Sequence, residues 1–103
     1  MFYNFKEYQK GDTLNQVEFQ LKINGVNIDL TGTVIEATFM LGMQTKVMSI
    51  GNGLTFTDIV NGKFKINKQI LDLENGLWQM EMIFIFADGT RKTYLKGQLN
   101  VVD

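Results

Sequence analysis

The chain has 103 residues, of which 45% are hydrophobic and 20% charged, and its formal net charge is -1. That length suits one domain, and a nearly neutral chain lacks the field that nucleic-acid or anionic-membrane binding uses. Cysteine and histidine are both missing, which excludes disulfides, thiolate nucleophiles and the commonest general base and transition-metal ligand. We therefore expect a single domain over 1–103 with no cofactor, no metal, no nucleic-acid partner and no membrane partner.

The first eight residues, MFYNFKEY, are rich in aromatic side chains but have no clean period. Such a segment is either an edge strand of the chain's own sheet or an arm that pairs with the sheet of a neighbouring chain. An edge strand is the simpler interpretation. In either case Phe2, Tyr3 and Phe5 are candidate interaction residues.

Residues 17–23, VEFQLKI, alternate between apolar and polar side chains, which predicts a strand with one buried face. Asn24 and Gly25 follow this strand. Both residue types tolerate positive φ, so they predict a tight hairpin turn before a short apolar segment at 26–28. The stretch DLTG at 29–32 then predicts a corner in the backbone.

The next predicted strand spans 33–41, and its core-facing side chains occupy alternate positions, namely Ile35, Ala37, Phe39 and Leu41. The stretch GNG at 51–53 predicts a flexible turn, and Asn61 with Gly62 predicts a second hairpin. Further strands are predicted at 46–50, 54–60 and 63–67.

Residues 68–75, KQILDLEN, form the only segment with helical spacing, because Ile70 and Leu73 lie three positions apart. A final predicted strand spans 91–101, with Thr93, Leu95, Leu99 and Val101 on one face. The chain thus contains seven to eight short strands, turn signals between them and almost no helix. This pattern predicts an all-β, antiparallel, immunoglobulin-like β-sandwich.

The predicted strand at 77–86 is apolar on both faces near its end. Trp78, Met80 and Met82 lie on one face, while the other begins polar and turns apolar at Ile83 and Ile85. Such a strand is either covered twice within the chain or packed on another subunit. We favour cover by the chain itself. If the strand packs on another subunit instead, Ile83 and Ile85 are the candidate interaction residues.

No constellation of side chains indicates catalysis. Asp29 and Asp88 lie beside threonine and glycine, where carboxylates commonly stabilise turns. Glu18 and Glu36 fall on outward strand faces, and Ser49, the only serine, has no histidine partner for a hydrolytic triad. The residues therefore give no support to an enzyme, and calcium binding at the acidic turns is likewise unsupported.

An ordered series of short motifs resembles a known family. The series is KGDT at 10–13, an Asn-Gly hairpin followed by DLTG, NGKFKI at 61–66, GLWQMEMIF and then DGTRKTYLKGQLNV. It resembles the N-terminal domain of phage baseplate upper proteins and related small tail proteins of phages and prophages. The resemblance spans nearly the whole chain, and its specificity lies in the order of the motifs.

The resemblance implies a non-enzymatic virion structural protein that contacts other virion proteins or itself. It also implies synthesis in the bacterial cytoplasm and association with the virion. Proteins of that family generally continue into coiled-coil or receptor-binding regions, whereas this sequence ends at Asp103, which is the pattern of an accessory component or small adaptor. The alternative is a carbohydrate-binding module for a cell-surface glycan, with Trp78, Tyr94 and Tyr3 as platforms that stack on sugars.

Overall fold

The computed structural model describes all 103 residues and is nearly all β. It has twelve strands, and its only helix is the single 3-10 turn η1 (Ile59–Asn61). The all-β class with almost no helix is therefore confirmed. The strands are β1 (Phe2–Gln9), β2 (Thr13–Leu14), β3 (Val17–Gln20), β4 (Lys22–Ile23), β5 (Val26–Asn27), β6 (Val34–Leu41), β7 (Gln44–Ile50), β8 (Gly53–Asp58), β9 (Lys63–Ile66), β10 (Gln69–Ile70), β11 (Gly76–Ile85) and β12 (Arg91–Val102).

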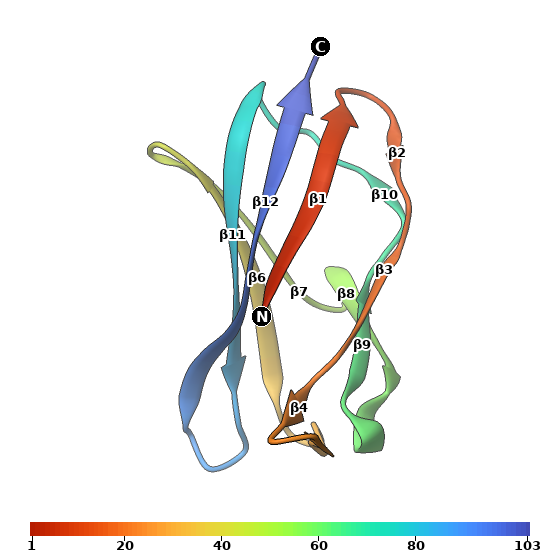
Figure 1. The fold of residues 1–103 in the computed structure, drawn as a ribbon, viewed down its shortest axis with the longest axis vertical. Coiled ribbons are helices and arrows are strands. Elements are labelled where there is room, and N and C mark those ends of the chain that lie inside the picture. The colour runs from red at the N-terminus through yellow and green to blue at the C-terminus, as the bar shows by residue number, and fades with distance from the viewer.

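Eight strands form one sheet in the order β1-β12-β11-β6-β7-β8-β9-β3. The sheet curls, so that β8, β9 and β3 face the longer strands β12, β11 and β6 across the core (Figure 1). Most neighbours are antiparallel, as predicted. Two pairs are parallel, however: β1 with β12, and β7 with β8. The sequence did not predict these two pairs, because their partners are not joined by a hairpin.

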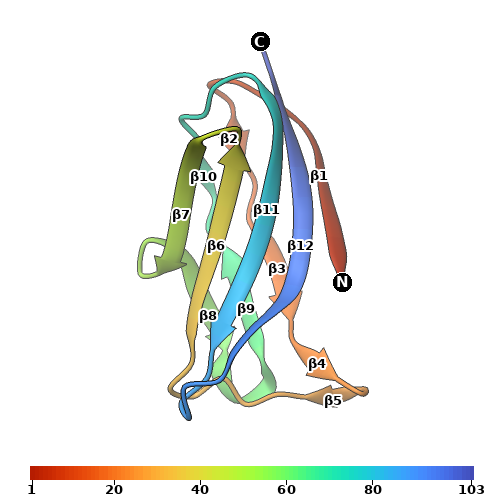
Figure 2. The ribbon, with the colours of Figure 1, turned by 90° about the vertical axis from the view of Figure 1, so that its left-hand side faces the viewer.

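The four remaining strands form two small ribbons at the ends of the molecule. β4 and β5 are joined by Asn24 and Gly25, with φ of 52° and 77°, which confirms the predicted hairpin. β10 pairs with β2 at the opposite end (Figure 2). The helical turn predicted at 68–75 is therefore wrong. Ile70 lies in β10 and is 66% exposed, whereas Leu73 is buried, so the two do not share a face.

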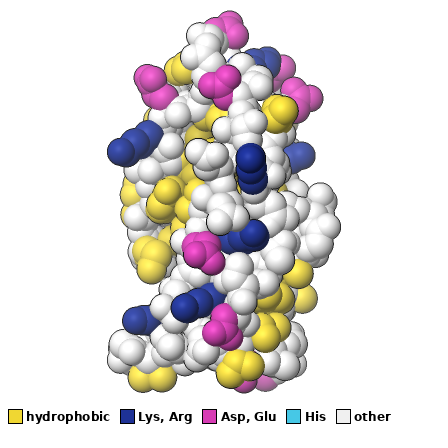
Figure 3. All heavy atoms as spheres, turned by 90° about the vertical axis from the view of Figure 1, so that its right-hand side faces the viewer, with side chains coloured by type: hydrophobic (Ala, Val, Ile, Leu, Met, Phe, Trp, Pro, Cys, Tyr) yellow, Lys and Arg dark blue, Asp and Glu magenta, His cyan; other side chains and the backbone are white.

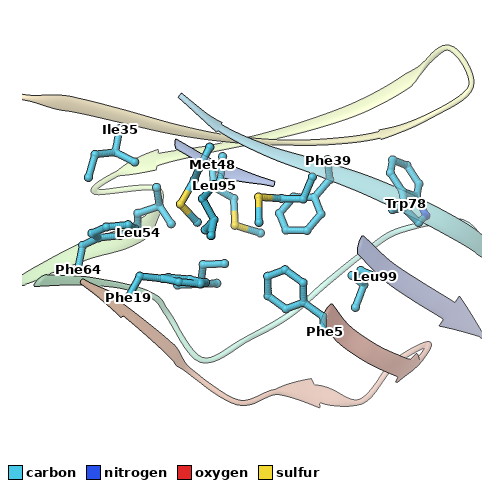
Figure 4. Packing of buried hydrophobic residues seen from close by; sticks show 14 of the residues in the cluster. Phe5, Phe19, Ile35, Phe39, Met48, Leu54, Phe64, Trp78, Leu95 and Leu99 are labelled. Atoms are coloured by element: carbon cyan, nitrogen blue, oxygen red, sulfur yellow. The ribbon is translucent and has the colours of Figure 1, made fainter. Parts of the chain in front are cut away.

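The core is one cluster of 21 buried hydrophobic residues contributed by both sides of the curled sheet. Phe64 on β9 packs edge-to-face against Phe84 on β11, with ring centroids 5.6 Å apart, and this contact spans the two sides. Figure 4 shows how Phe5, Phe39 and Leu99 continue the same layer toward Trp78. Burying rings and aliphatic side chains from every long strand is what holds the curl closed.

Strand alternation places the core residues as expected along β6 and β11. Ile35, Ala37 and Phe39 are buried, and so are the alternate residues of β11 from Trp78 to Phe84. The prediction fails at one point in β12. A bulge opposite Met82 and Ile83 leaves Tyr94 without a partner between the rungs Met82–Leu95 and Ile83–Thr93. Thr93 consequently pairs with the outward Ile83 and does not share the inner face of Leu95.

Candidate functional site

The acidic residues singled out in the sequence lie in turns. Asp29 Oδ1 accepts hydrogen bonds from the backbone N–H of Thr31 at 2.9 Å and from its hydroxyl at 2.6 Å. These bonds, the hydroxyl first, lower the pKa of Asp29. Asp88 accepts the backbone N–H of Thr90 at 2.8 Å, and that bond is the main cause of its lowered pKa. The predicted turn role of both carboxylates is confirmed.

The structure brings together no group of three or more acidic side chains that could hold a metal ion. Every buried side-chain nitrogen and oxygen has a hydrogen-bond partner, so no orphaned polar atom indicates a missing ligand. Ser49 on β7 is the ladder neighbour of Glu36 on β6, but the chain has no histidine that could complete a hydrolytic triad with them. No helix has the length and apolar character needed to cross a membrane.

The N-terminal segment folds back on the chain itself. β1 is an edge strand and pairs in parallel with β12, which confirms the edge-strand interpretation. Phe2 is 60% exposed, but Phe5 is buried and Tyr3 packs edge-to-face on Phe5 and Phe19 at centroid distances of 4.7 and 5.4 Å. Of the three aromatic candidates, only Phe2 therefore presents most of its surface to a partner.

A groove of about 330 Å³ lies between β1 and the segment from β2 into β3, where the two edge strands of the sheet approach without pairing. Its walls include Tyr8 and Leu14 and the carboxylates of Glu7 and Asp12. Figure 3 shows hydrophobic side chains along the left margin of this side of the molecule. Farther along the same gap, a void of about 20 Å³ lined mostly by apolar side chains, including Phe19 and Tyr94, is too small for more than a water molecule.

The second predicted pair of interaction residues lies at the centre of an outer face. Ile83 and Ile85 point away from the core on β11, which is flanked by β12 and β6. No second layer covers this face (Figure 2), so the expected cover within the chain is not found. Both isoleucines are half-buried by their neighbours in the sheet alone.

The same face carries further apolar side chains that the sequence interpretation missed. Val34 on β6 pairs with Ile85 and is 48% exposed, and Val47 on β7 is exposed to the same extent. The signal was available, since Val34 precedes the core-facing Ile35 by one position and must therefore point outward. By contrast, the outer face of β8, β9 and β3 is polar or charged, with Glu18, Gln20, Thr55, Lys63 and Lys65 (Figure 3).

The rings proposed as sugar platforms are not free. Trp78 is 2% exposed, and its indole N–H donates to the backbone oxygen of Glu74 at 2.8 Å. Tyr94 is half-buried against Phe84 and Phe86, at centroid distances of 5.8 and 6.1 Å. Trp78 therefore cannot stack on a glycan in this structure, and no other observation favours sugar binding over protein contact.

Comparison of the chain with protein-family models, with curated proteins and with solved structures gave no match. Two features of the chain therefore bear on its function, namely the contrast between its two outer faces and the ordered motifs of its sequence.

Proposed function

We propose that the chain is a non-enzymatic structural or assembly protein of a phage or prophage particle, in the baseplate or another part of the tail. It works through protein–protein contacts, is made in the bacterial cytoplasm and becomes part of the virion. The ordered motifs supply the resemblance to tail proteins. The observation that carries the contact role is the outer face of β6, β11 and β12, where Val34, Ile83 and Ile85 lie uncovered.

The physical reason is the difference between the two outer faces. When one face of a sheet meets only water, the outward residues of its strands are expected to be polar, as they are on β3, β8 and β9. Contiguous apolar side chains on an uncovered face typically mark an interaction surface. A sheet face is also rigid, so this chain loses little conformational freedom when a partner docks on it.

We also propose that the curled sheet is an immunoglobulin-like sandwich. One layer would be β1-β12-β11-β6-β7 and the other β8-β9-β3, with the two-residue parallel pairing of β7 and β8 as the passage between them. Two features support this division. Phe64 and Phe84 pack between the layers, and β11 and β12 form the long hairpin at the centre of the larger layer.

The test of the virion role uses the cells that carry the gene. Particles induced from them are purified by density gradient, and their proteins are identified by peptide mass spectrometry. We expect the 11.8 kDa chain to co-sediment with tails in constant ratio to the major tail proteins. Recovery of the chain only from the soluble fraction, with particles of full infectivity when the gene is deleted, would overturn the proposal.

The contact face is tested in the same cells with paired variants. Ile83→Lys places a charge on the apolar face, whereas Thr55→Lys places the same charge on the polar outer face as a matched control. We expect Ile83→Lys to lower incorporation into particles at least tenfold and Thr55→Lys to leave it unchanged. Equal incorporation of both variants would assign the contact to another surface.

A further inference from the structure

Charged side chains of opposite sign flank the apolar outer face on its two sides. Ile85 lies on a rung between Val34 on β6 and Arg91 on β12, and the next outward-facing rung places Ile83 between Glu36 on β6 and Thr93 on β12. We call Val34, Glu36, Ile83, Ile85 and Arg91 the β11 patch. Its centre is apolar, its β6 side carries a carboxylate and its β12 side carries a guanidinium.

Neither charge of the β11 patch faces an opposite charge within the sheet. The ladder neighbours of Glu36 are Ile83 and Ser49, and the neighbour of Arg91 is Ile85. The following outward-facing rung is different, because Glu81 there has the oppositely charged Lys96 as its ladder neighbour. The β11 patch thus offers one unmatched acid and one unmatched base on opposite sides of an apolar centre.

We infer that the β11 patch is the contact between two copies of this chain, related by a two-fold axis that runs parallel to β11. This inference rests on the proposed contact role of the face and names its partner. Rotation about such an axis lays β12 of one copy over β6 of the other. Arg91 of each copy then lies over Val34 of the second copy, one outward-facing rung from Glu36 of that copy, and the isoleucines pack on their own equivalents.

Charge selects this axis over its alternative. Two sheets can also pack face to face about a two-fold axis perpendicular to their strands. That arrangement lays β6 over β6 and β12 over β12, which brings Glu36 against Glu36 and Arg91 against Arg91. Like charges at a contact are costly, so Glu36 and Arg91 favour the axis along β11; Glu81 also faces its own equivalent across that axis, but Lys96 of both copies lies on the same rung. A self-complementary patch of one acid and one base is what a closed dimer requires.

The size of the patch sets the expected strength. A standard interface buries about 800 Å² per partner, and the whole chain exposes 6012 Å². A patch centred on three aliphatic side chains lies below that standard, so we expect a dimer in the micromolar range or weaker. Raising the salt concentration should weaken it, because the flanking pairs are near the rim.

The experiment is sedimentation velocity of the purified chain over a hundredfold range of concentration. We expect a concentration-dependent dimer in the unmodified chain. Glu36→Arg and Arg91→Glu should each raise the dissociation constant at least tenfold, because each makes both flanking contacts repulsive. An equimolar mixture of the two single variants, one carrying an affinity tag, should form a heterodimer, and the double variant should regain the homodimer.

Glu18→Arg on the polar outer face makes the same charge change as a matched control and should leave the dimer unchanged. Circular dichroism confirms that each variant is folded. A chain that is monomeric over the whole concentration range overturns the inference. A dimer whose dissociation constant is changed by neither Glu36→Arg nor Arg91→Glu also overturns it. Neither result overturns the virion role, because particle incorporation and its response to Ile83→Lys are measured separately.

Discussion

Asp29 and Asp88 are exposed carboxylates whose function is to hold turns. In each case a threonine two positions ahead donates to the carboxylate, so the ionised form is the one that the turn favours. The residue types alone predicted this role. Their lowered pKa values therefore follow from local hydrogen bonds and are no sign of a catalytic or metal site.

The lowered pKa of Asp29 predicts how stability depends on pH. A depressed pKa in the folded state stabilises the protein above the unfolded value of about 3.9, and the contribution is lost as pH falls through the folded pKa. We expect Asp29→Ala to lower the melting temperature by a few degrees at neutral pH and by less in acid. Asp29→Asn keeps an acceptor for Thr31 and should lose less at neutral pH. An equal drop for Asp29→Ala at both pH values would contradict the assignment.

Tyr8 links β1 to the β2–β10 ribbon at one end of the molecule. Its side chain is buried, its hydroxyl accepts the backbone N–H of Leu71 at 3.0 Å, and it donates to the backbone oxygen of Asp12. No pattern in the sequence indicated this link, because Tyr8 and Leu71 lie 63 positions apart. Partners that distant are brought together only by the folded sheet.

Removing this hydroxyl is expected to destabilise the protein without changing the shape of the core. Tyr8→Phe leaves the N–H of Leu71 and the oxygen of Asp12 without a partner, which should cost about 1–3 kcal/mol of unfolding free energy. Urea unfolding followed by Trp78 fluorescence measures the change. Tyr94→Phe is the control, since no protein hydrogen bond to its hydroxyl is present. A loss of similar size in both variants would show that the Tyr8 bonds contribute little.

At the scale of elements, the alternation of apolar residues predicted β6 and β11 and their buried faces. Asn24 and Gly25 predicted the β4–β5 hairpin, because turn chemistry is local. Errors arose where a local pattern had two solutions. Ile70 and Leu73 have helical spacing, yet Gln69 and Ile70 pair with β2 instead. The bulge at Thr93 and Tyr94 has no sequence signal, and it reverses the faces on which the residues of β12 lie from that point.

The pairing of β1 with β12 depends on close approach at Gly97. A Cβ atom there would collide with the backbone oxygen of Tyr3 and would lie 3.1 Å from Met80 Cε. Gly97→Ala should therefore push β1 away from β12 and lower the unfolding free energy by about 1–3 kcal/mol. Equilibrium urea unfolding gives the value, and faster amide exchange in residues 2–9 would locate the damage. Gln98→Ala, on the outer face beside it, should change stability by less than about 0.5 kcal/mol. Unchanged stability of Gly97→Ala would show that β1 tolerates a shift.

At the scale of the whole molecule, composition and alternation predicted the all-β class, but the order of strands was beyond them. Nothing in MFYNFKEY identifies β12 as its partner, and the same aromatic residues would suit an arm on another chain. The candidate surface was predicted in part for the same reason. The sequence shows that the strand carrying Ile83 and Ile85 is apolar on both faces. The inward position of Tyr3 and Phe5, by contrast, follows from the pairing of β1 with β12, which only the fold determines.

The parallel pair of β1 and β12 also has a consequence for folding time. The amino group of Met1 donates to the backbone oxygen of Tyr94 across 93 positions of sequence, and the edge strand beside it pairs with residues up to Val102. During synthesis β1 leaves the ribosome before β12, so it has no partner in the sheet until residues 91–102 have emerged. Its exposed edge is then open to wrong pairing. Sheets dominated by such distant contacts fold in milliseconds to seconds, so we expect the pairing of β1 with β12 to form slowly.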